Sequence, residues 1–324
     1  MRRSLVRVAS VAAVALTLTA CGGPGETGAP NPRGLEKPVL NVGVVPVPDS
    51  APLQIAQQRG FFREEGLTVR AKPIKASPEA TPMLLNGSMD LALLNYVSTF
   101  TAQDKGAISF KLVADSYQGT SNSFALLTGK DSRIATPADL RGKKIAVPAV
   151  RSVTDLLLAV RLRTAGLDPA RDVTVTPIPL AGMGAALRQG SVDAVAAVEP
   201  FVTGVQNEHG ARRLADLVTG PTRDFPIAGW GGTARFAERN PKTVAAFQRA
   251  IGKALRVAAD RDEVVKAIPA YTRIPAETAA AITLGSFPAT LDAARLERVA
   301  ALMREFGYLS RTPDIASMLV AQPR

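Results

Sequence analysis

The chain has 324 residues, of which 46% are hydrophobic and 21% charged, the balance of a globular protein large enough for two lobes. A single Cys excludes an internal disulfide framework and a Cys-rich metal site, and a single His leaves little for His-based catalysis or a zinc site. The net charge is +11, but the Lys and Arg residues are scattered. We therefore expect a solvated basic surface rather than nucleic-acid binding, and no cofactor.

The first residues are typical of a bacterial export signal. MRRSLVR is positively charged, and the apolar run after it is too short to span a membrane comfortably. The run ends in Leu-Thr-Ala-Cys at residues 18–21, which resembles the lipobox of lipoproteins. We expect 1–20 to be a lipoprotein signal peptide, 21–37 a flexible tether, and Cys21 a lipid anchor on the outer face of the cytoplasmic membrane. An ordinary secretory signal with an incidental Cys is the alternative.

Strands alternate with helices along the rest of the chain. The first series is a strand at 40–45, a helix at 52–59, a strand at 68–71, a helix at 79–85 and a strand at 90–94. The second series is a strand at 144–147, a helix at 152–164, a strand at 173–176, a helix at 184–188, a strand at 194–198 and a helix from Pro200. From about residue 233 the pattern is mostly helical, as at 242–259 and 292–305. This order predicts two α/β lobes with parallel sheets.

One local pattern occurs twice, once in each series. LLNGSMDLAL surrounds Gly87, and ALRQGSVDAV surrounds Gly190. Each reads as the end of a helix, a glycine in the left-handed conformation, and an Asp that begins a buried strand. We expect Asp90 and Asp193 to have a packing role and assign them no ligand.

Six segments carry a family resemblance. They are IAQQRGFFREEGLTV at 55–69, NGSMDLA at 86–92, ADLRGKKIAVP at 138–148, AGL at 165–167, GSVDA at 190–194 and EPF at 199–201. In this order they resemble the solute-binding proteins of ABC transporters, in the branch that handles sulfonates, nitrate, taurine and thiamine-precursor pyrimidines. The chain departs from that pattern before Glu199, where Ala-Val replaces the usual aromatic residue.

The resemblance implies a type 2 periplasmic-binding-protein fold, in which two α/β lobes are joined by a two-strand hinge and followed by a helical C-terminal segment. One lobe would comprise 38–127 plus 228–324 and the other 128–227, with 124–128 and 227–231 as the crossing strands. It implies a monomeric binding protein that captures a small-molecule solute for an ABC permease and its ATPase, with no catalysis. An enzyme of thiamine-pyrimidine or menaquinone-precursor biosynthesis on the same fold is the alternative.

Open parallel sheets bind ligands beyond the carboxyl ends of their strands. Applied to the predicted strands, this rule gives a set of candidate ligand-binding residues. In the first lobe they are Asp49, Ser50, Ser77, Asn95 and Tyr96; in the second they are Arg151, Ser152, Thr154, Gly182, Met183 and Glu199; at the hinge there is Trp230.

Several of these residues permit a second interpretation. The serines precede helices, so they either help the free amides to bind an anion or only cap the helix. Arg151 either clamps an anionic group or lies at the rim of the cleft. Glu199 is either structural or pairs with an amine, and Trp230 either contacts the ligand or packs in the hinge. The preferred ligand is an aliphatic sulfonate or a taurine-like anion, with nitrate or a pyrimidine as alternatives.

Overall fold

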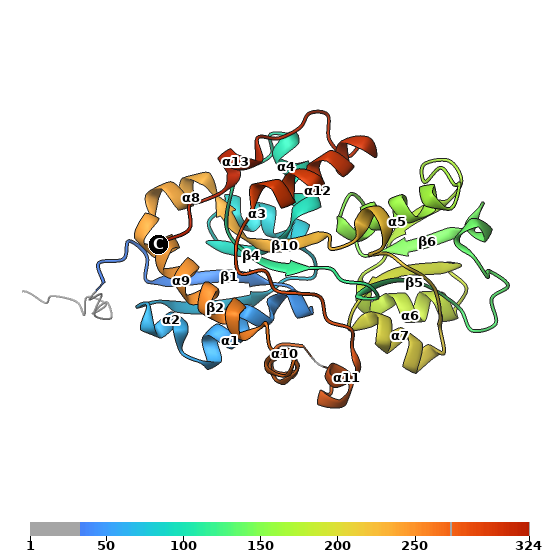
Figure 1. Ribbon diagram of the computed structural model, residues 1–324, viewed down its shortest axis with the longest axis horizontal. Helices are drawn as coiled ribbons and strands as arrows, with labels where there is room; N and C mark the ends of the chain where they lie inside the picture. Colours follow the sequence, from blue (N-terminus) through green and yellow to red (C-terminus); the bar gives the residue numbers. More distant parts are fainter. Residues whose placement is uncertain (1–32, 273, 324) are drawn as a thin grey trace, which may run out of the picture.

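The computed structural model describes residues 33–272 and 274–323. The expected signal peptide, Cys21 and most of the expected tether therefore lie outside the described residues. Two five-stranded sheets, each flanked by helices, lie side by side along the long axis of the molecule (Figure 1). This confirms the two-lobed α/β fold. No helix in the described part of the chain is long and apolar enough to cross a membrane.

The first sheet has the strand order β2-β1-β3-β10-β4, and we call it and its helices lobe 1. Its strands are β1 (Val39–Val44), β2 (Thr68–Pro73), β3 (Leu91–Asn95), β4 (Phe110–Gln118) and β10 (Pro226–Thr233). The helices of lobe 1 are α1 (Ala51–Gln58), α2 (Phe61–Glu64), α3 (Ala80–Leu85), α4 (Tyr96–Asp104), α8 (Ala234–Arg239), α9 (Pro241–Val257), α10 (Arg261–Ala267), α11 (Ala276–Ala281), α12 (Ala293–Glu305) and α13 (Ile315–Met318). Strand β1 runs parallel to β2 and β3, whereas β10 runs antiparallel to β3 and β4.

The second sheet has the order β7-β6-β8-β5-β9, and we call it and its helices lobe 2. Its strands are β5 (Phe124–Thr128), β6 (Lys144–Val147), β7 (Thr174–Pro177), β8 (Ala194–Val198) and β9 (Arg212–Asp216), and its helices are α5 (Val153–Thr164), α6 (Leu180–Arg188) and α7 (Phe201–His209). Strand β6 is parallel to β7 and β8, and β5 is antiparallel to β8 and β9. Both sheets therefore have the same plan: three parallel strands, then an antiparallel strand, then an edge strand.

The chain crosses between the lobes twice, at 119–123 and at 217–225. The segments expected to be crossing strands, 124–128 and 227–231, instead lie within one sheet each. Strand β5 pairs with β8 along its whole length, from Phe124 opposite Val198 to Thr128 opposite Ala194. Those backbone hydrogen bonds place β5 in lobe 2, so the first crossing precedes the expected lobe boundary at 127.

The repeated Gly-Ser-x-Asp pattern ties neighbouring parallel strands together. Its two glycines have φ of +76° and +69°, the left-handed conformation that glycine adopts without strain. In lobe 1 the Asp90 carboxylate accepts from the backbone N–H of Asn41 at 2.9 Å, and in lobe 2 Asp193 accepts from that of Lys144 at 2.8 Å. The N–H of each Asp donates back to the carbonyl of the same partner. Each Asp thus fixes the register between two parallel strands, which is a packing role.

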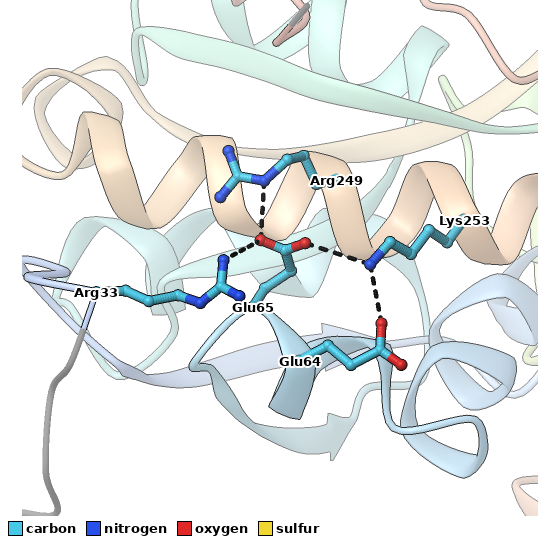
Figure 2. Close-up of polar contacts among 5 residues, drawn as sticks. All are labelled: Arg33, Glu64, Glu65, Arg249 and Lys253. Carbon is cyan, nitrogen blue, oxygen red and sulfur yellow. Dashed lines mark hydrogen bonds and ion pairs between the residues drawn. The ribbon is translucent and has the colours of Figure 1, made fainter.

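The N-terminal end of the described chain is held to α9 by ion pairs (Figure 2). Glu65, at the end of α2, accepts from Arg33 at 3.2 Å, Arg249 at 2.8 Å and Lys253 at 3.4 Å. Lys253 also pairs with Glu64 at 2.9 Å. Burial acts to raise the pKa of Glu65, but Arg249 and Lys253 outweigh it and lower the pKa overall. We call these five residues the Glu65 cluster.

Candidate functional site

A cavity lies between the two lobes, and its empty space together with the open solvent at its mouth is about 600 Å³. Its wall includes residues at or just beyond the carboxyl ends of β1, β3, β6 and β8, namely Val45, Asn95, Pro148 and Val198. The remaining wall residues next to the two crossings are Phe124, the first residue of β5, and Ile227 and Ala228, near the start of β10. This position agrees with the general rule for ligand sites on open parallel sheets.

Most of the cavity wall is apolar, and few side chains on it are polar. Five of the expected site residues are among them: Asp49, Ser77, Asn95, Ser152 and Thr154. These five residues are distant in the sequence and lie on one cavity wall in the structure, as expected from their positions at strand ends. Lys75, Phe124 and Ile227 also line the cavity and were not anticipated. Lys75 lies two residues beyond the end of β2, a position to which the same rule applies.

Asp49 is the most unusual polar residue of the wall. It lies in a short 3-10 helix at Pro48–Ser50 and is only 5% exposed. Its Oδ1 atom has no hydrogen-bond partner among the described residues. Burial raises the pKa of its carboxyl to about 7, because the charged form loses its hydration. The backbone carbonyl of Asp49 accepts from the Ser116 hydroxyl at 2.7 Å, which fixes the residue to β4.

Ser77 and Asn95 form a connected pair on the lobe 1 side. The Ser77 hydroxyl oxygen accepts from the backbone N–H of Asn95 at 2.8 Å. Asn95 in turn caps α4, because its side-chain oxygen accepts from the N–H of Ser98 at 2.8 Å. These bonds hold the end of β3 against the Ser77–Glu79 turn, so both side chains are placed by rigid elements.

The N-terminus of α5 supplies the lobe 2 side of the polar wall. Ser152, Val153 and Thr154 line the cavity at the start of this 12-residue helix. The Ser152 hydroxyl donates to the carbonyl of Ala149 at 2.7 Å and does not cap the helix. The first-turn amides therefore have no side-chain cap, and they carry the partial positive charge of the helix end.

Four other expected residues lie away from the cavity wall. The Ser50 hydroxyl donates to the carbonyl of Val45 at 2.6 Å and secures the turn after β1. Tyr96 is fully buried and donates to Asp115 at 2.8 Å. Its phenol passes over Gly229, where an added Cβ would lie 2.3 Å from the hydroxyl oxygen. The remaining two, Gly182 and Met183, belong to α6, with Met183 in the core of lobe 2.

Glu199 and Trp230 also have structural surroundings. Glu199 is 1% exposed and caps α7 by accepting from the N–H of Thr203 at 3.0 Å and from its hydroxyl at 2.8 Å. Burial raises the pKa of Glu199 despite these bonds. Trp230 is fully buried in lobe 1, with its ring edge-on to Phe247 at a centroid distance of 6.0 Å. Neither side chain belongs to the cavity wall.

Arg151 joins the lobes instead of lining the cavity. Its guanidinium donates to the backbone carbonyl of Tyr308, in the segment after α12, and lies 5.0 Å from the centre of the Tyr308 ring. Within α5 itself, Arg163 pairs with Glu305 at 3.5 Å and lies 3.9 Å from the centre of the Phe306 ring. We call these five residues the α5–α12 contact. It links lobe 2 to the C-terminal part of lobe 1 beside the cavity.

Comparisons with known proteins agree with this architecture. The sequence profile of the NMT1-like family matches residues 33–269. The nitrate/nitrite binding protein NrtA of Nostoc sp. is 25% identical over 241 residues, which are 69% of this chain and 54% of that protein. A Bacillus subtilis protein named for aliphatic-sulfonate binding is 28% identical over 248 residues, or 75% of this chain and 71% of that protein. The chain thus spans little more than half of the first relative.

Solved structures support the fold. The periplasmic aliphatic sulphonate binding protein SsuA from Escherichia coli superposes with a TM-score of 0.69 at 23% identity, over 86% of this chain and 96% of that one. The desulfurization enzyme DszB superposes with a TM-score of 0.65 at 17% identity, over 87% of this chain and 96% of that one. Binding proteins and an enzyme share this fold, so the fold alone does not indicate the activity. The function has to be inferred from the residues of the site.

Proposed function

Since the chain belongs to the NMT1-like family, we propose that it is the extracytoplasmic solute-binding component of an ABC importer. It captures a small organic anion between its lobes and delivers it to a permease that works with an ATPase. The observation that carries this proposal is the cavity between two lobes connected by two crossings. Such lobes close around a ligand by a hinge motion, and the permease recognises the closed form. The relatives named for nitrate and sulfonate binding support an anionic ligand.

The chemistry of the wall favours an aliphatic sulfonate over nitrate. Nitrate is small and polar on all sides, so an apolar wall adds nothing to its binding. An alkyl chain gains about 0.8 kcal/mol for each CH₂ group it buries. The α5 N-terminus, Ser77 and Lys75 offer donors or positive charge to a sulfonate. A flat pyrimidine fits less well, because Phe124 is the single aromatic residue among the described residues of the wall.

Calorimetric titration of the mature protein with a series of linear alkanesulfonates and with nitrate tests this choice. We expect affinity to rise about three- to fourfold with each CH₂ until the cavity is full, which corresponds to about 0.8 kcal/mol per group. Val198→Thr, on the wall, should reduce this gain, whereas Val150→Thr, at an exposed position beside the site, should not. Tighter binding of nitrate than of every sulfonate would overturn the ligand class.

The enzyme alternative has its own experiment. A binding protein returns its ligand chemically unchanged, whereas an enzyme such as a desulfurase would release a new product. We expect mass spectrometry to recover the sulfonate intact after long incubation with the purified protein. If a product forms in proportion to the protein concentration, the protein is an enzyme and the proposal of a transport function is wrong.

The proposed location depends on the N-terminal segment. We propose that Cys21 carries a lipid that holds the protein on the outer face of the cytoplasmic membrane, within reach of its permease. Cys21→Ala should give a precursor that is not lipidated, or a protein released from the membrane fraction. If the variant still takes up labelled palmitate and sediments with membranes, the anchor is elsewhere.

A further inference from the structure

We propose that Asp49 selects the ligand by receiving a positively charged nitrogen at the cavity wall, so that the preferred ligand is a zwitterion. This inference rests on the proposed function, because it names a second chemical group on the captured anion. The anionic end would face the α5 N-terminus and Lys75, and the ammonium would face the Asp49 carboxylate.

The contrast with the other buried acids carries the argument. Among the described residues, five acidic residues are buried, and four of them have a partner within the protein. Glu65 pairs with Arg249, Asp90 with Lys37, Asp115 with Arg295, and Glu199 with the N-terminal turn of α7. Asp49 alone among these acids has an oxygen without a partner, and it alone lies on the cavity wall. A buried carboxylate without a partner is costly, and a cationic ligand group offsets that cost.

The groups around Asp49 leave this position open to a ligand. The Asp49 carboxylate interacts electrostatically with two buried phenols. They belong to Tyr117 of β4 and to Tyr271, which follows the turn at Ile268–Ala270. Burial raises the pKa of both phenols, and the Asp49 carboxylate raises it further, so both stay neutral. Lys75 is the single cation among the described residues of the cavity wall, and no salt bridge joins it to Asp49. The backbone of Asp49 is tied to Ser116.

Proton exchange distinguishes a cationic from a purely anionic ligand group at Asp49. An ammonium stabilises the ionised carboxylate, so its binding at neutral pH releases a proton. A sulfonate placed there would favour the protonated carboxyl, so its binding would take up a proton. The sign of the proton count therefore reports which group Asp49 contacts.

Matched ligand pairs provide the experiment. Ethanesulfonate is compared with 2-aminoethanesulfonate, and propanesulfonate with 3-aminopropanesulfonate, by calorimetry at pH 6 and pH 8 in buffers of different ionisation enthalpy. We expect the amine-bearing member to bind more tightly and to release protons. Its affinity should be about tenfold higher at pH 8 than at pH 6, since the carboxyl with a pKa of about 7 is mostly ionised only at the higher pH. Proton uptake, or weaker binding at pH 8, would overturn the proposal.

Two variants complete the test. Asp49→Asn should lose the preference for the amine and the pH dependence, while alkanesulfonate binding persists and reports a folded site. Glu199→Gln changes a buried acidic residue that lies outside the cavity wall. This variant should keep the preference for the amine and the pH dependence of binding. If wild type and Asp49→Asn bind alkanesulfonates and amino-sulfonates equally well, this inference fails and the proposed function stands. If neither protein binds any sulfonate, the ligand class of the proposed function fails.

Discussion

The guanidinium of Arg151, two residues before α5, donates to the backbone carbonyl of Tyr308, beyond the end of α12. The two residues belong to different lobes, so this bond, together with the contact between the guanidinium and the Tyr308 ring, holds lobe 2 against lobe 1. The position of Arg151 in the sequence suggested a ligand contact, but the structure gives it a partner in the protein.

Arg151→Ala should therefore favour an open arrangement of the lobes. Losing a charged hydrogen bond and a cation–π contact should cost about 1–3 kcal/mol of inter-lobe interaction. We expect a larger radius of gyration in solution scattering without ligand, and weaker ligand binding as an indirect result. Arg163→Ala should act in the same direction, because it removes the second half of the α5–α12 contact. Arg171→Ala, exposed in lobe 2, provides the control with the same loss of charge. Identical scattering from Arg151→Ala and wild type would contradict this role.

Asp49 should make the stability of the ligand-free protein depend on pH. Its pKa in the folded state is raised to about 7, so its stabilising contribution is complete below the unfolded pKa and is lost as pH rises through about 7. Asp49→Asn lacks this titration. Relative to the variant, wild type should lose on the order of 2–4 kcal/mol between pH 4 and pH 8, at about 1.4 kcal/mol per unit of pKa shift. If the difference in free energy of unfolding between wild type and Asp49→Asn is the same at both pH values, the Asp49 carboxyl is solvated and its pKa is not raised.

The Glu65 cluster should contribute stability with the opposite pH dependence. The pKa of Glu65 is lowered in the folded state, so its contribution is present above the unfolded pKa and disappears as pH falls through the folded pKa. We expect Glu65→Gln to cost about 1–2 kcal/mol at pH 7, because its cations are partly exposed, and less at pH 3, where a smaller fraction of Glu65 is ionised. Glu64→Gln is the matched control, since Glu64 is exposed and, within the described part of the chain, forms an ion pair with Lys253 alone. Denaturant titrations at the two pH values measure both, and an equal deficit at pH 3 would point to lost packing instead.

The repeated Asp residues should differ in importance according to their burial. The Asp90 side chain is 4% exposed and also pairs with Lys37 at 2.6 Å, whereas the Asp193 side chain is 40% exposed. Asp90→Ala removes the acceptor of the half-buried Asn41 N–H and the partner of Lys37, whose side chain is 43% exposed, and should cost about 2–3 kcal/mol. Asp193→Ala exposes its strand end to water and should cost about 1 kcal/mol. If thermal unfolding shows the same loss of stability for Asp90→Ala and Asp193→Ala, burial does not determine how much each Asp contributes.

Much of the fold could be predicted because the two series of strands and helices are local patterns. The strands at 144–147 and 194–198 have the predicted bounds in the structure, and the helix predicted at 292–305 differs from α12 by one residue. The pattern did not reveal β4, since a nine-residue strand buried on both faces lacks alternation. Nor did it reveal α4, which begins directly after β3 with no loop between them.

The site was predicted only in part because strand ends locate a residue but do not orient its side chain. Asp49, Ser77 and Asn95 line the cavity as their positions suggested. Tyr96 follows Asn95 directly, yet a buried partner, Asp115, draws its phenol into the core. Arg151 turns to a carbonyl of the C-terminal segment, which lies more than 150 residues away in the sequence. Such long-range partners leave no signal in the local sequence.

The position of β10 between β3 and β4 has a consequence for the order in which the chain folds. All the strands of lobe 2 lie between the two crossings, so lobe 2 is complete once residue 216 has been synthesised. The sheet of lobe 1 has a gap between β3 and β4 until residues 226–233 emerge and pair with both. On the ribosome the lobe that begins later in the chain therefore finishes first, and the lobe that contains both ends of the described chain closes around its last strand.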